Sequence, residues 1–129
     1  MLTACSSFNP DWKSLDHQSS LSGIEGRWTG IWKSDRNQHT GRLRCILTRQ
    51  TDARYLARFE AKFWKLFTAH YAVPLSVRPR GDEWEFFGTE NLGWYAGGRY
   101  NYEGVVNKTN FFSTYRCKWD HGVFRMSRP

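Results

Sequence analysis

Residues 26–32, Gly-Arg-Trp-Thr-Gly-Ile-Trp, open roughly one hundred residues in which apolar and polar side chains alternate. Alternation with a period of two indicates strands that bury one face. The pattern predicts eight strands, at 25–33, 41–49, 53–66, 69–79, 83–91, 98–107, 110–117 and 121–128. We therefore expect an all-β fold, a single antiparallel up-and-down β-barrel of about eight strands, with no substantial helix.

The third predicted strand shows most clearly which side chains face inward. Small and large apolar residues alternate on one face, as they would to fill a tapering interior: Ala53, Tyr55, Ala57, Phe59, Ala61 and Phe63. In the fourth strand Tyr71 and Val73 face inward and Pro74 faces outward. A proline within a strand is typical of an edge or a bulge, so we expect irregular pairing around Pro74.

Polar clusters of turn-forming residues separate the predicted strands, at 34–41, 80–82, 107–110 and 120–122. The segment 92–98, which includes Trp94, is instead apolar and rich in glycine. Two interpretations stay open for it. It is a bent strand corner packed by its own aromatic residues, or a flexible flap over the mouth of the barrel.

The composition limits the partners more than the fold. The 129 residues carry a formal net charge of +7, which favours phosphates, anionic head groups and acidic proteins as partners. No apolar run approaches the length of a membrane-spanning helix. Nucleic acid binding is not expected, because the basic residues are not interleaved with exposed aromatic residues.

The N-terminal segment points to the cell envelope. Residues 2–5, Leu-Thr-Ala-Cys, resemble the lipobox of bacterial lipoproteins, in which lipid is attached to the cysteine, here Cys5. Because only Met1 precedes the box, either the true start lies upstream or the sequence begins inside the signal. The alternative is an ordinary N-terminal cysteine. Residues 6–23 read as a flexible tether.

These observations divide the chain into 1–23, a signal remnant and tether, and 24–129, the barrel domain. We expect a location in the bacterial periplasm or cell envelope and membrane association through lipidated Cys5. In the absence of an upstream signal, the expected location is the cytoplasm. Cys45 and Cys117 remain as a pair that is either disulfide-bonded or free, and their predicted strands are not neighbours. No cofactor is expected, and no Cys or His spacing predicts a metal site.

The Gly26-x-Trp28 motif at the start of an eight-strand pattern resembles the opening of lipocalin and wider calycin barrels. In that family an arginine of the last strand packs across the tryptophan, so the resemblance implies a contact between Arg128 and Trp28 that closes the barrel. The chain departs from the family at residues 107–110, where lipocalins have a Thr-Asp-Tyr turn, and at Pro129, where they continue into a helix. We therefore interpret it as a divergent lipocalin-like barrel of a bacterial lipoprotein family, and carry over no binding residues.

The leading functional hypothesis is a non-enzymatic barrel that binds a small apolar or amphipathic ligand. Its candidate lining residues are aromatic: Trp32, Tyr55, Phe59, Tyr71, Trp84, Trp94, Tyr100 and Tyr102. The alternative is a solid-core interaction module that binds an anionic partner through a basic outer wall. That wall comprises Arg42, Arg44, Arg54, Arg58 and Lys62. No serine or cysteine nucleophile occurs in a diagnostic motif, and Asp120-His121 reads as a turn, so we do not expect an enzyme.

Overall fold

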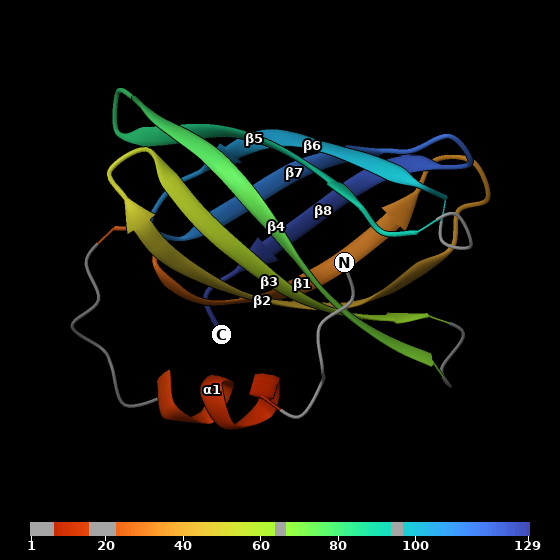
Figure 1. Ribbon diagram of the computed structural model, residues 1–129, viewed down its shortest axis with the longest axis horizontal. Helices are drawn as coiled ribbons and strands as arrows, with labels where there is room; N and C mark the ends of the chain where they lie inside the picture. Colours follow the sequence, from red (N-terminus) through yellow and green to blue (C-terminus); the bar gives the residue numbers. More distant parts are fainter. Residues whose placement is uncertain (1–6, 16–22, 64–66, 94–96) are drawn as a thin grey trace.

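The computed structural model describes residues 7–15, 23–63, 67–93 and 97–129. Eight antiparallel strands form a closed barrel in the order of the sequence, β1 to β8, with β8 pairing back to β1 (Figure 1). The strands are β1 Gly26–Ser34, β2 Thr40–Thr51, β3 Arg54–Phe63, β4 Phe67–Arg80, β5 Glu83–Asn91, β6 Arg99–Val106, β7 Asn110–Arg116 and β8 His121–Ser127. The all-β barrel predicted from the alternation is confirmed.

The predicted strand boundaries lie within two residues of the observed ones, except at the end of β3, where 64–66 lie outside the described residues. Pairing between β3 and β4 is regular through Pro74. On the other side of β4, the pairing with β5 begins only at Leu75, so the expected irregularity at Pro74 is found there and not on the β3 side. Pro74 is exposed on the outer face, and the β3–β4 register accommodates it without a shift. The register shift falls instead in β2, between Arg49 and Thr51.

The up-and-down topology gives the barrel two distinct ends. We call the mouth the end that carries the β1–β2, β3–β4, β5–β6 and β7–β8 connections, on the right in Figure 1. The opposite end, the base, carries the other connections and the start of β1. The β1–β8 seam closes tightly at two glycines. A Cβ atom at Gly30 would collide with the carbonyl oxygen of Arg125, and one at Gly122 with that of Lys33.

A short helix, α1 Phe8–Ser14, lies outside the barrel near β1, β2 and β3 (Figure 1). It falls in the segment that the sequence predicts to be a tether. Phe8 is only 2% exposed, because the helix packs against the barrel wall. Because α1 has only seven residues, it adds little helix, and the fold remains dominated by the strands of the barrel.

Candidate functional site

The base of the barrel is closed by Arg128 and Trp28. The Arg128 guanidinium lies 4.1 Å from the centre of the fully buried Trp28 ring, which is the contact implied by the Gly-x-Trp motif. Its nitrogens also donate to carbonyl oxygens of Gly23, Glu25, Arg27 and Lys108, at 2.7–3.2 Å. One side chain thereby joins the start of β1, the β6–β7 connection and the end of the chain.

Aromatic rings contact one another along most of the interior. Near the base Trp28 and Phe86 both pack on Phe111, with ring centres 5.6 and 5.1 Å apart. Farther toward the mouth a second group of rings surrounds Phe59 and Phe124 at centre distances of 5.2–6.2 Å. This second group comprises Phe59, Tyr71, Tyr102, Tyr115 and Phe124. The interior is therefore rich in stacked aromatic rings from base to mouth.

The predicted lining residues divide between the two ends. Tyr55 and Trp84 lie near the base, at the starts of β3 and β5. The others that the structure describes lie in the middle or the mouth half: Trp32, Phe59, Tyr71, Tyr100 and Tyr102. Phe59, Tyr71 and Tyr102 are buried, whereas Trp32 and Tyr100 are partly exposed. Trp94 lies outside the described residues.

Tyrosine hydroxyl groups gather in the mouth half. The Tyr71 and Tyr102 hydroxyls interact with each other, and the Tyr100 hydroxyl interacts with the Cys117 thiol. Burial raises the pKa of Tyr71, Tyr100 and Tyr102 above the usual tyrosine range, since an ionised phenol would be poorly solvated there. These groups are therefore neutral hydrogen-bonding groups at physiological pH.

Small residues lie on the inner face of β2, β3 and β4 near the mouth. Gly41, Ala61 and Ala69 all have inward register, and Ala61 pairs directly with Ala69. The Trp32 indole N–H donates to the Lys62 carbonyl oxygen at 3.0 Å, which fixes the ring at the rim. The Trp32 ring also lies directly over Gly41, where an added Cβ atom would collide with the indole nitrogen.

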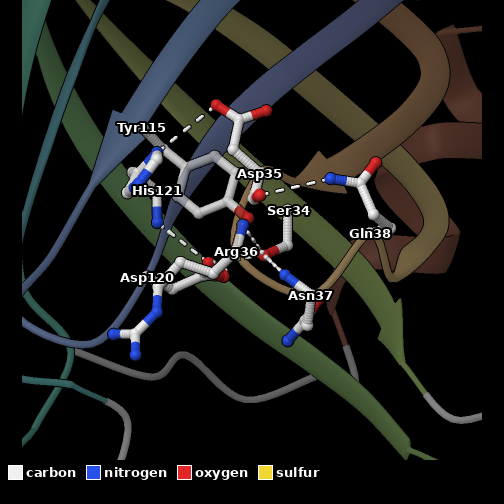
Figure 2. Close-up of polar contacts among 8 residues, drawn as sticks. All are labelled: Ser34, Asp35, Arg36, Asn37, Gln38, Tyr115, Asp120 and His121. Carbon is white, nitrogen blue, oxygen red and sulfur yellow. Dashed lines mark hydrogen bonds and ion pairs between the residues drawn. The ribbon is translucent and has the colours of Figure 1, made fainter.

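A polar clamp holds two mouth connections together (Figure 2). The buried Ser34 hydroxyl donates to one Asp120 carboxylate oxygen at 2.6 Å, and the Tyr115 hydroxyl donates to the other at 3.0 Å. The Ser34 oxygen also accepts the main-chain N–H groups of Arg36 and Asn37. The β1–β2 turn is thus fixed to the β7–β8 turn.

The clamp residues have structural partners rather than the geometry of a catalytic triad. Asp120 accepts from Ser34 and Tyr115 and from the main-chain N–H of His121 at 2.8 Å. The His121 imidazole lies instead near Asp35, with Nδ1 and Oδ2 3.3 Å apart. The Asp120 carboxylate therefore orients a hydroxyl and a turn, and not an imidazole that could activate Ser34.

Cys45 and Cys117 are free thiols in the structure. Cys45 is fully buried in the interior, and burial raises the pKa of its thiol. Cys117 is half-buried beside Gly97, at which a Cβ atom would lie 2.9 Å from its sulfur. Cys5 lies outside the described residues, so its lipidation stays a prediction. Within the described ranges no cluster of three or more His, Cys, Asp or Glu side chains is placed to hold a metal ion.

The predicted basic wall is only partly open to solvent. Arg42, Arg54 and Lys62 are exposed, whereas Arg44 and Arg58 are half-buried against α1. Beside the wall, and sharing Arg54 with it, a groove of about 810 Å³ crosses the outer face of β3–β7. It is lined by residues that include Arg54, Arg78, Glu103 and the exposed Phe87. Sequence reasoning missed this groove, because its residues come from five strands.

Comparisons with protein-family models, with curated proteins and with solved structures found no match to this chain. The closed eight-stranded antiparallel barrel is consistent with a calycin-like fold. Across the described residues, the structure contains no helix with the length and apolar character needed to cross a membrane.

Proposed function

We propose that the protein binds a small, flat, amphipathic molecule in the mouth half of its barrel, without catalysing a reaction. The supporting observation is the group of tyrosines Tyr71, Tyr100 and Tyr102 in an otherwise apolar interior. Phenylalanine would fill the same space without a hydroxyl to remove from water, although every buried side-chain hydroxyl among the described residues has a hydrogen-bond partner that offsets this cost. A ligand that uses those hydroxyls gives them a function.

The chemistry of the mouth half also indicates the class of ligand. The aromatic faces of Trp32 and Tyr100 favour a planar or aliphatic body, and the hydroxyls favour one or two hydrogen-bonding groups on it. Glu90 pairs with Tyr100 across β5 and β6 and has inward register, so it places a carboxylate near the same end. This chemistry disfavours a strongly anionic ligand.

The proposal is tested with the neutral fluorescent probe N-phenyl-1-naphthylamine, whose emission rises in apolar sites. We expect saturable binding to the full chain with a dissociation constant of about 1–10 μM, or roughly −7 to −8 kcal/mol. Ala61→Trp should reduce the affinity at least tenfold, because it fills the small side of the mouth. Arg80→Trp, on the exposed outer face at the base, is the matched control. Absence of saturable binding, or equal binding by Ala61→Trp, would contradict the proposal.

The runner-up hypothesis is an interaction module with a packed interior. The ring contacts within the base group and within the mouth group favour it, since they leave fewer gaps between the aromatic residues of each group. The probe experiment separates the two hypotheses, because a barrel with a packed interior takes up no probe there. Any probe fluorescence of such a barrel would not depend on the residue at position 61, provided that the variant is folded. We also propose that the protein lies in the cell envelope and that Cys5 carries lipid.

A further inference from the structure

Helix α1 depends on the barrel wall for its stability. It has seven residues, and isolated helices shorter than about 12 residues are marginal in water. Its N-cap residue, Ser7, makes no capping hydrogen bond with its side chain. The Ser7 hydroxyl instead accepts a hydrogen bond from Arg58 at 3.1 Å. The helix therefore forms because it is bound, as a peptide ligand would be.

Aromatic and acidic groups of α1 meet arginines of the wall. The Phe8 and Trp12 rings, one helical turn apart, both lie under the Arg44 guanidinium, at 5.1 and 4.8 Å. Arg27 covers Trp12 from the other side at 5.0 Å. Asp11 forms an ion pair with Arg58 at 2.7 Å. Two rings and a carboxylate are thus held by three arginines.

The wall beneath the helix has the character of a prepared surface. Glu60 is 7% exposed although it lies on the outer face, and it holds Arg44 by an ion pair at 2.6 Å and His70 at 2.9 Å. The His70 ring in turn packs on Phe8. Ile46, also outward in register, is only 3% exposed and pairs with Arg27 and Arg58, which both contact α1. An outward-facing isoleucine is stabilised when another part of a protein shields it from water.

The helix does not neutralise the wall. Arg27, Arg44 and Arg58 contribute three positive charges and Glu60 one negative, which leaves +2 with His70 neutral. The Asp11 and Lys13 charges of α1 cancel, so the docked pair remains at +2. The exposed Arg42 of β2 and Lys62 of β3 add to the positive electrostatic potential of the wall. A more acidic helix would therefore match the wall better than α1 does.

We propose that this wall, formed by Arg27, Arg44, Ile46, Arg58, Glu60 and His70, is a docking site for a partner protein. The partner supplies an acidic amphipathic helix with two aromatic residues one turn apart, and α1 occupies the site until that helix displaces it. Because α1 and the wall belong to the same chain, α1 competes intramolecularly for the site, so it excludes weak ligands and yields to stronger ones. This function is independent of the ligand site inside the barrel.

The test uses the full ¹⁵N-labelled chain carrying Phe8→Ala and Trp12→Ala, which uncovers the wall. An end-blocked peptide of residues 7–15 and an acidic version with Lys13→Glu and Ser14→Glu are titrated separately, and amide shifts are followed by NMR. We expect both peptides to shift amides of β1–β4, with the acidic version at least threefold tighter. The unsubstituted chain should bind each peptide at least tenfold more weakly, because α1 competes.

Arg58→Ala in the uncovered chain should weaken binding at least tenfold, whereas Arg80→Ala, an exposed arginine at the base end, should not change it. Lys13→Ala on the exposed face of α1 should leave the wall covered. No binding to the uncovered chain, equal binding to the unsubstituted chain, or insensitivity to Arg58→Ala would each overturn the proposal. If the double variant loses its amide dispersion, Asp11→Arg replaces it as the uncovering change, with the same expectations.

Discussion

The interior tyrosines distinguish this barrel from an ordinary hydrophobic core. Tyr71 stacks on Phe59 with ring centres 5.2 Å apart, and its hydroxyl is shielded from water together with that of Tyr102. Each phenol is neutral there, because burial disfavours the ionised form. The hydroxyls therefore have a measurable consequence that does not depend on any ligand.

We expect the protein to lose stability at alkaline pH through these residues. The pKa of Tyr71 is raised in the folded state, so the unfolded chain releases a proton above about pH 10 that the folded chain retains. The contribution is complete below about pH 10 and falls as the pH rises toward the folded pKa. At pH 11 the stability lost through such a group is about 1.4 kcal/mol.

Urea unfolding at pH 8 and pH 11 measures this effect. Tyr71→Phe should make the loss between the two pH values smaller by about 1 kcal/mol. Tyr55→Phe, at the base, should change it less, because the Arg49 charge opposes the effect of burial on the pKa of Tyr55. The same pH dependence in Tyr71→Phe and the unsubstituted chain would show that Tyr71 ionises freely in the folded state.

At the scale of elements, Arg128 determines how well the first and last parts of the barrel hold together. It stacks on Trp28 and donates to carbonyl groups of the β1 start and the β6–β7 connection. We expect Arg128→Ala to lower the free energy of unfolding by about 2–4 kcal/mol, from the lost cation–π contact and charged hydrogen bonds. Chemical denaturation at pH 7 gives the value.

Arg125→Ala is the matched control for this change. Arg125 lies on the outer face of β8 and is exposed, with its guanidinium 4.8 Å from the Phe112 ring centre. Its removal should cost no more than about 1 kcal/mol. Equal losses for the two variants would mean that the stacking on Trp28 does not secure the seam.

The strands were predictable from sequence because each buries one face, so the period-two pattern carries the fold. The Trp28–Arg128 contact was predictable because an up-and-down barrel brings the end of β8 beside the start of β1. Helix α1 was missed, since seven residues give too short a periodic signal, although Phe8 and Trp12 at i and i+4 and outward Ile46 were visible signs. The Ser34–Asp120 clamp joins residues 86 apart and has no local signal.

At the scale of the whole molecule, the two proposed sites lie on different surfaces of one barrel. The proposed ligand site involves the inner face of β2–β4 and the tyrosines of β4 and β6, whereas the proposed docking wall is the outer face of β1–β4. β4 contributes inward Tyr71 to the first and outward His70 to the second. Adjacent residues of one strand thus serve opposite faces, as the pleat requires.

The central claim is that the mouth half of the barrel holds a small flat molecule. A crystal structure of the full chain soaked with N-phenyl-1-naphthylamine tests it most directly. The account predicts density for the probe inside the mouth, in contact with Tyr71 and Tyr100. Density confined to the outer groove beside Phe87, or an interior occupied only by protein side chains after soaking at saturating probe, would contradict it.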